Sequence, residues 1–367
     1  MSIHKTEKNS SMKIRLLGKT PEELKEIALQ EGLPGFAGGQ MAQWMYRKKV
    51  RSIEEMTNIS KAGRERLMQK YEVGVAPVIS CAESSDGTRK YLFRVSCSHR
   101  TGLNRADTDD NLETGAIEAV MIPDDDRKTL CVSAQAGCRM GCRFCMTGRQ
   151  GFHGNLSAAD IISQYIAVDE SDSLTNTVFM GMGEPLDNYE NVLRTMEILT
   201  APWGFGWSPK RITLSSVGVL PNLRRFLDET RCHLAISLHN PLGQERSEMM
   251  PVQSAYPLED VLKLIREYDF SGQRRVSFEY TMFSGFNDDK AHADALVRLL
   301  RGLECRVNLI RFHKIPDFPY ETSPAPVMEM FRNRLNASGI TCTIRASRGE
   351  DILAACGMLA GKHNTGK

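Results

Sequence analysis

The sequence predicts an α/β protein in which a full or partial (β/α) barrel follows a small helical accessory domain. Two observations lead to this prediction. From residue 127 onward, β-like and helical segments alternate with short connections, which is typical of consecutive parallel strands. The first hundred residues instead contain short amphipathic helices and a hairpin-like signal, which indicates a separate, smaller unit.

The accessory domain is expected over residues 1–95. Its helical segments are predicted at residues 21–29, 40–50, 52–56 and 61–70. A Gly-containing turn signal at 84–88 lies between two β-like segments and predicts a hairpin. A connecting region, 96–127, begins as a polar loop and then contains a predicted strand at 117–122. The three Asp residues at 124–126 favour a solvated turn over a metal site.

The barrel is expected over residues 128–361, with a tail at 362–367. Strands are predicted at 129–134, 176–181, 211–216, 233–238, 276–282, 306–312 and 341–346. Helices are predicted between them, at 158–169, 189–200, 221–229, 258–269, 289–302 and 326–337. Active sites of such folds lie at the carboxyl ends of the strands, and the conspicuous motifs of this sequence fall at those ends.

Composition limits the class of protein. The chain has 367 residues, an apolar fraction of 41% and a net charge of +2, which are ordinary values for a globular protein. No segment approaches the roughly 20 apolar residues that a membrane span needs, so a cytoplasmic location without membrane contact is expected. Ten cysteines in such a chain favour metal or redox chemistry over a disulfide scaffold.

Three of these cysteines, Cys138, Cys142 and Cys145, lie on one loop after the predicted strand at 129–134. Gly137 and Gly141 are interleaved, so the backbone can fold tightly enough to point three thiolates at one soft metal centre. A structural zinc site usually has a fourth Cys or His, and no second close-spaced pair is visible in the sequence. Three unrelated buried cysteines are the other alternative. We favour a metal centre with one open coordination position.

The cysteine loop resembles that of the radical S-adenosylmethionine (SAM) enzymes, in which three cysteines hold a [4Fe-4S] cluster and SAM binds the fourth iron. The resemblance implies a partial barrel of the radical SAM type, with this cluster and SAM as cofactors. It implies SAM contacts from the strand ends, at Gly183, Glu184, Ser215, Ser237, Leu238, His239 and His313. The polar members of this set could equally be ordinary strand-end groups that hydrogen-bond within the protein.

Motifs spread from about residue 15 to 361 resemble one radical SAM family, the RNA adenine methyl synthases RlmN and Cfr. They lie at residues 56–61, 86–88, 131–133, 138–148, 151–152, 181–185, 237–239 and 348–357. The resemblance implies methylation of C2 of an adenosine in 23S rRNA and of the tRNA adenosine beside the anticodon. C8 methylation of 23S rRNA is the alternative within the family. A zinc-stabilised RNA-binding protein without catalysis is the alternative from another class. One departure is His313, where the family commonly has Asn.

The family's chemistry implies roles for two more cysteines and an acid. An adenine ring carbon is too weak a nucleophile for direct methyl transfer, so a carbon radical is required. Cys356 matches the cysteine that first accepts a methyl group from SAM. A second SAM per turnover, reduced by a donor such as flavodoxin or ferredoxin, yields the radical that activates this methyl group. Cys131 matches the cysteine that then releases the product as a disulfide forms. Glu118 matches the base that takes the ring proton, although it could also be the outward residue of a strand.

RNA binding is predicted at the basic N-terminal part of the chain, where residues 1–75 hold 14 Lys and Arg against nine Glu and no Asp. The predicted contacts are Arg47, Lys48, Lys49 and Arg51, with Trp44 and Tyr46 stacking on bases. A basic helical surface without a partner, with Trp44 packed in the core, is the alternative.

Overall fold

A ten-stranded sheet is the centre of the fold in the computed structural model, which describes residues 13–97, 113–272 and 274–360. The strand order is β14-β13-β12-β11-β10-β9-β6-β5-β4-β3. The tail at 362–367 and most of the predicted loop that begins the connecting region lie outside the described residues. No helix in the described ranges is long and apolar enough to span a bilayer.

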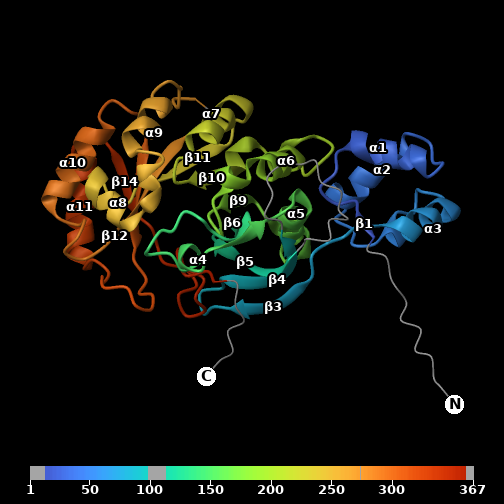
Figure 1. The fold of residues 1–367 in the computed structure, drawn as a ribbon, viewed down its shortest axis with the longest axis horizontal. Coiled ribbons are helices and arrows are strands. Elements are labelled where there is room, and N and C mark those ends of the chain that lie inside the picture. Colours follow the sequence, from blue (N-terminus) through green and yellow to red (C-terminus); the bar gives the residue numbers. More distant parts are fainter. Residues whose placement is uncertain (1–12, 98–112, 273, 361–367) are drawn as a thin grey trace, which may run out of the picture.

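Seven strands of the sheet form a parallel array, which confirms the predicted alternation of strands and helices. These strands are β6 (Arg127–Cys131), β9 (Asn176–Phe179), β10 (Ile212–Ser216), β11 (His233–Ser237), β12 (Val276–Met282), β13 (Arg306–Arg311) and β14 (Thr341–Ile344). The connecting helices are α5 (Ala158–Ala167), α6 (Tyr189–Thr200), α7 (Leu220–Glu229), α9 (Leu258–Ile265), α10 (Lys290–Leu300) and α11 (Ala325–Ala337). Figure 1 shows α7, α9, α10 and α11 along the outer side of the curved sheet. Because β14 and β3 are the edges of this sheet, the barrel is partial.

The residue pattern of each element explains its place. Strand β11 has consecutive buried apolar residues, Leu234, Ala235 and Ile236, as expected for a parallel strand covered on both faces. Helix α9 buries one apolar stripe, including Val261 and Ile265, which are spaced by one helical turn. Other barrel helices repeat this pattern, so the core lies between the helices and the sheet.

The sheet continues beyond β6 through three antiparallel strands, β5 (Glu113–Asp124), β4 (Arg89–Cys97) and β3 (Val78–Glu83). The predicted turn between β5 and β6 is confirmed, and it contains the exposed residues Asp125 and Asp126. The hairpin β3–β4 was expected in the accessory domain. In the structure, β4 pairs with β5 along its whole length, so the hairpin continues the main sheet.

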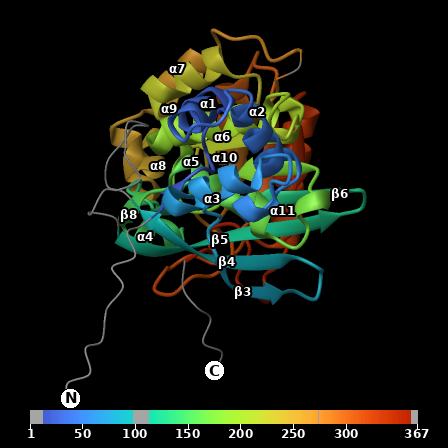
Figure 2. The same cartoon turned by 90° about the vertical axis from the view of Figure 1, so that its right-hand side faces the viewer.

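The accessory domain consists of short helices and one small parallel pair of strands. Its elements are β1 (Ile14–Arg15), α1 (Pro21–Gln30), α2 (Ala37–Ala42), a π-helical turn (Gln43–Arg47), a 3-10 turn (Ile53–Glu55), α3 (Lys61–Lys70) and β2 (Tyr71–Glu72). Figure 1 shows these helices beside α5 and α6, at the opposite end of the molecule from α10 and α11, and Figure 2 views the molecule from this domain. The predicted helical character of this part is therefore confirmed.

Basic side chains hold the accessory domain on the barrel. Arg51 donates to the carbonyl oxygens of Ile166 (3.1 Å) and Ala167 (3.4 Å) at the end of α5. Arg47 donates to the Pro202 carbonyl, and Lys49 donates to the Ser171 carbonyl. These three cations were predicted to contact RNA. In the structure their donors bind carbonyl groups of the barrel, and the contact with RNA stays a prediction.

The remaining members of the predicted RNA surface are also engaged within the protein. Tyr46 is fully buried, and its hydroxyl donates to the Lys19 carbonyl oxygen at 2.7 Å, so its ring cannot stack on a base. The Lys48 ammonium lies 3.5 Å from the centroid of the Trp44 ring, in a cation–π contact. In this structure the basic cluster at residues 47–51 attaches the accessory domain to the barrel.

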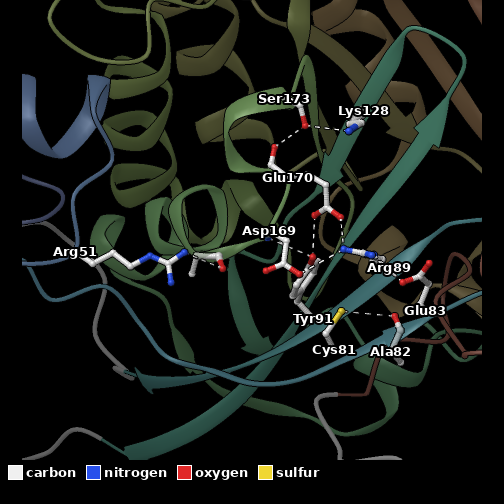
Figure 3. A network of polar contacts seen from close by, with 11 residues as sticks. Arg51, Cys81, Ala82, Glu83, Arg89, Tyr91, Lys128, Asp169, Glu170 and Ser173 are labelled. Carbon is white, nitrogen blue, oxygen red and sulfur yellow. Dashed lines mark hydrogen bonds and ion pairs between the residues drawn. The ribbon is translucent and has the colours of Figure 1, made fainter.

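A second polar network joins the β3–β4 hairpin to the segment that follows α5 (Figure 3). The Arg89 guanidinium forms ion pairs with Glu83 (2.9 Å), Asp169 (3.4 Å) and Glu170 (3.0 Å). The Tyr91 hydroxyl donates to the other Glu170 oxygen at 2.8 Å. The hairpin is thereby fixed against the layer of helices that covers the parallel strands.

We predict that Arg15→Ala weakens the attachment of the accessory domain. The Arg15 guanidinium lies 2.6 Å from Asp160, whose side chain is 2% exposed, so its removal leaves a buried carboxylate without its cation. The expected loss is about 2–3 kcal/mol in the free energy of unfolding, measured by urea denaturation. Lys61→Ala, at an exposed position of α3, is the control. Equal unfolding free energies for the two variants would contradict the prediction.

Candidate functional site

The three-cysteine loop is closed by a short antiparallel ribbon, β7 (Gln135–Gly137) and β8 (Phe152–Asn155). Gly137 has φ +73°, and a Cβ there would overlap the carbonyl oxygen of Gly151. The Cys138 N–H donates to that same oxygen at 2.8 Å. Glycine at 137 therefore lets the two ends of the loop meet, as the sequence predicted for a tightly folded cysteine loop.

The loop covers a cavity of about 160 Å³ at the carboxyl ends of the parallel strands. The thiols of Cys138, Cys142, Cys145 and Cys356 all line it. Five residues of the predicted SAM set also line it, namely Gly183, Glu184, Ser215, Ser237 and His239. The structure thus brings together side chains that come from five different parts of the sequence.

The cysteine loop fits a bulky cationic group. Burial, reinforced by the neighbouring Cys145, raises the pKa of the Cys142 thiol to about 12, and burial also raises the pKa of Cys138 well above its ordinary value. Thiolates in this setting need a strong positive charge, which a bound metal centre supplies. Across the described ranges, no three Cys, His, Asp or Glu side chains are grouped closely enough to hold a single metal ion. Three cysteines that line one cavity fit the three-thiolate donor set that a [4Fe-4S] cluster with one open iron needs.

Ser215 and Ser237 present hydroxyl groups to the cavity. In the described part of the chain neither hydroxyl makes a hydrogen bond, so both can donate to or accept from a ligand. His239 lies beside them, with φ +55°. Its Nδ1 accepts the Thr281 N–H at 3.0 Å, which leaves the proton on Nε2. Burial, together with Arg246, lowers the pKa of His239 to about 3, so the ring is a neutral donor at physiological pH.

Glu184 is part of the cavity wall, where it joins two strand ends. One of its carboxylate oxygens accepts the Leu186 N–H and the other accepts the Val217 N–H, each at 3.0 Å. Burial raises the pKa of Glu184 to about 7, although these hydrogen bonds oppose the rise. Gly183, with φ +95°, makes the tight turn that precedes it.

Two members of the predicted SAM set do not line the cavity. Leu238 is fully buried, and its carbonyl oxygen accepts a hydrogen bond from Arg246 (3.0 Å) instead of facing a ligand. His313 turns away into a neighbouring groove, where its ring contacts Glu350 (3.3 Å) and Ser347 (3.2 Å). A residue that follows a strand in sequence can point to either side of the strand end, and the SAM contacts of Leu238 and His313 stay predictions.

Cys356 and Cys131 lie near one another, but only Cys356 opens to the cavity. Cys356 is accessible to solvent and lies among the strand ends, whereas Cys131, at the end of β6, is buried. Burial and the nearby Cys356 thiol raise the pKa of Cys131 to about 12. The cavity walls desolvate the Cys356 sulfur on its inner side and raise the pKa of the thiol, although the Arg345 guanidinium opposes this rise.

Glu118 lies on β5, behind the segment that carries Cys356. Its side chain is buried and forms an ion pair with Lys90 at 2.9 Å. Its second carboxylate oxygen accepts the Ala360 N–H at 2.6 Å. Glu118 therefore points inward, which contradicts the alternative of an outward strand residue. The segment that contains Ala360 covers its carboxylate.

Three charged residues at the site were not found from the sequence. Arg246 is fully buried and donates to the carbonyl oxygens of Leu238 and Ser237, each at 3.0 Å. Glu279 lines the cavity from β12, and its Oε2 lacks a hydrogen bond but lies 3.5 Å from Arg345. The signal for Glu279 was available, since an acid between Phe278 and Tyr280 in a buried parallel strand is costly unless it is used. No comparable signal existed for Arg246.

The partial barrel, the three-cysteine loop and the cavity beneath it define a radical SAM protein. Consistently, a model of the radical SAM superfamily matches residues 132–296, and a model described as the ribosomal RNA large subunit methyltransferase N-terminal domain matches residues 14–73. The family follows from the relatives. A probable dual-specificity RNA methyltransferase RlmN from Porphyromonas gingivalis is 53% identical over 356 residues, which cover 97% of this chain and 96% of that protein.

Two further comparisons agree with this assignment. The dual-specificity RNA methyltransferase RlmN of Syntrophus aciditrophicus is 39% identical and covers 95% of this chain and 97% of its own length. The crystal structure of a radical SAM methyltransferase from Sphaerobacter thermophilus is 36% identical, with a TM-score of 0.86, and the match covers 95% of this chain and 100% of that one. The chain belongs to the RlmN family of radical SAM methyltransferases.

We predict that Gly183→Ala damages the cavity wall. Besides its positive φ, a Cβ at this position would lie 2.8 Å from the Gln135 backbone nitrogen, and Gln135 is fixed by a hydrogen bond to Asn155. The expected cost is about 1–3 kcal/mol of stability, with at least a tenfold weaker SAM affinity in the reconstituted protein, by calorimetry. Gly39→Ala is the control, because its Cβ would meet no atom within 4 Å. An unchanged SAM affinity in Gly183→Ala would contradict the prediction.

Proposed function

We propose that this protein methylates C2 of an adenosine in 23S rRNA and of the adenosine beside the anticodon in tRNA. One observation supports this most directly: Cys356 lines the same cavity as the three cysteines of the loop, and Cys131 lies close behind it. Relatives that cover nearly the whole chain carry the name dual-specificity RNA methyltransferase, which supports both RNA substrates.

Two groups of residues bind the cofactors in the proposed reaction. Cys138, Cys142 and Cys145 would hold the [4Fe-4S] cluster, and Ser215, Ser237 and His239 would bind SAM. When bound, these cofactors supply the methyl group and the hydrogen-abstracting radical, with two SAM molecules used per turnover. The protein positions the reactants, because the strand ends hold the cofactor pocket next to the thiol of Cys356. They also limit the access of water to this pocket.

Cys356 carries the methyl group to the RNA. Its sulfur accepts the methyl group, and the activated carbon then forms a bond to the adenine ring, so that RNA and protein are covalently joined through Sγ. Cys131 attacks this sulfur. The Sγ–carbon bond breaks, and its electron pair stays with the former methylene carbon, which takes a proton from solvent and becomes the methyl group of the base. The unpaired electron left by the radical addition would be returned to the one-electron donor, and a disulfide between Cys131 and Cys356 remains. A reductant of the thiol class must restore both thiols before another turnover.

Glu118 takes the proton that leaves the ring carbon. Its carboxylate is held by Lys90 and by the Ala360 N–H, so the segment at Ala360 must release it before it can act as a base.

The proposed function is tested by mass mapping of RNA from a strain that lacks the gene. The expected result is loss of the C2 methyl group from one 23S rRNA adenosine and from tRNA, restored by the wild-type gene but not by Cys356→Ala. Loss of a C8 methyl group instead would favour the alternative regiochemistry, and unchanged adenosine methylation in both RNAs would contradict the proposal.

We predict that Cys131→Ala protein accumulates covalently bound to RNA, because the adduct forms on Cys356 but is not resolved. Purified protein should shift in a denaturing gel, and ribonuclease should reverse most of the shift. Cys342→Ala is a matched control, since Cys342 is also buried and burial likewise raises its pKa to about 12. Cys131→Ala protein without RNA, from cells with normal RNA methylation, would show that Cys131 is only a packed strand residue.

A further inference from the structure

A second concave surface lies beside the cysteine cavity. This groove, of about 610 Å³, is formed by the residues that follow β13 and β14. It shares Phe312 with the cysteine cavity, and both lie at the carboxyl edge of the parallel sheet. A ligand in the groove therefore lies next to a ligand of the cysteine cavity.

The groove has an excess of positive charge. Arg311, Lys314 and Arg345 line it, together with the acids Glu321 and Glu350. Glu321 is paired with Lys314 at the surface, where both side chains are more than 60% exposed and such a pair is weak. Glu350 faces the ring of His313. Neither acid is paired with an arginine of the groove.

Arg311 is the most available of the three cations. It is the last residue of β13 and is half-buried, and within the described ranges its guanidinium makes no hydrogen bond or ion pair. Arg345 lies between the groove and the cysteine cavity. Its guanidinium is 3.7 Å from the sulfur of Met180, which lines that cavity, and its charge acts on the thiol of Cys356.

This charge suits the backbone of an RNA strand. An adenine that reaches Cys356 must leave its base stack, so the phosphates on either side of it remain at the rim of the cysteine cavity. Arginine donates well to phosphate, and each neutralised phosphate also releases counterions. The cluster around Arg47, Lys49 and Arg51 donates to carbonyl groups of the barrel, whereas the Arg311 side chain lies beside the cysteine cavity.

Resting on the proposed function, we propose that the groove lined by Arg311, Lys314 and Arg345 binds the phosphates that flank the target adenosine of the substrate RNA. Arg311 supplies the contact to phosphate, whereas Arg345, which is paired with Glu279 at 3.5 Å, adds only weak positive charge near Cys356. The groove thereby aligns the strand so that only one nucleotide enters the cysteine cavity.

The test compares the two ends of one strand. Arg306 is exposed at the start of β13, and Arg311 is the last residue of this strand. Arg306→Ala, at the amino end of the strand, is therefore a matched control for Arg311→Ala at the carboxyl end. The probe is a fluorescently labelled anticodon stem-loop RNA with an adenosine beside the anticodon, titrated with cluster-loaded protein at several salt concentrations. Iron content, SAM affinity and thermal midpoint are measured for each variant.

Arg311→Ala should weaken RNA binding about tenfold and reduce the slope of log affinity against log salt by about 0.7–1. Arg311→Lys should retain most of the salt slope, and Arg306→Ala should match wild type. The iron content and SAM affinity of all variants should equal those of wild type.

Equal RNA affinity and equal salt slope for Arg311→Ala and Arg306→Ala, with wild-type RNA still bound and methylated, would overturn the groove assignment alone. A wild-type protein that neither binds nor methylates this RNA or 23S rRNA would contradict the proposed function, and the groove assignment would fall with it.

Discussion

The contact between the cysteine loop and the segment at 356–359 places Cys356 beside the three loop cysteines, and the cavity depends on this contact. The Met146 N–H donates to the Gly357 carbonyl oxygen at 2.8 Å, and the Thr147 hydroxyl donates to the Leu359 carbonyl oxygen at 2.7 Å. The second of these bonds joins residues 212 positions apart in the chain. Without this contact, Cys356 has no fixed position relative to the three loop cysteines. The cavity is therefore completed only when the last strand of the barrel and its following segment have folded.

The antiparallel extension of the sheet supports this same segment. At the β3–β4 turn, the Asp86 carboxylate accepts the Gly349 N–H at 3.0 Å, and the Ser84 hydroxyl donates to Asp351 at 2.5 Å. Lys90, on β4, bonds the Leu353 carbonyl as well as Glu118. The hairpin that resembled part of the accessory domain in sequence is thus the support for the segment bearing Cys356. Its polar contacts are buried or half-buried and fix one geometry, which apolar packing alone does less well.

The sequence predicted those features of the structure that depend on residues close together in the chain. Apolar strands, amphipathic helices and the spacing of Cys138, Cys142 and Cys145 depend on neighbours in the chain, so the partial barrel and the loop were predictable. The environment of Arg246 depends on carbonyl groups of two strand ends and could not be read from its helix. His313 follows a strand as His239 does, but only the turn geometry of each strand end decides which one faces the cavity. Arg47 illustrates the same limit, because a basic cluster looks alike whether it binds RNA or a carbonyl of its own protein.

The different burial of Cys356 and Cys131 gives the proposed reaction an order. Cys356 faces the cavity and meets a bound ligand directly, whereas Cys131 is enclosed behind it and has a pKa near 12, so it stays protonated at physiological pH. Cys131 does not line the cavity, so it does not compete with Cys356 for the methyl group of a ligand bound there. Its attack requires loss of a proton at a late stage, and the Arg345 guanidinium is the nearby charge that lowers the pKa of the Cys131 thiol. Premature disulfide formation is disfavoured by the same burial, since thiol–disulfide exchange needs a thiolate.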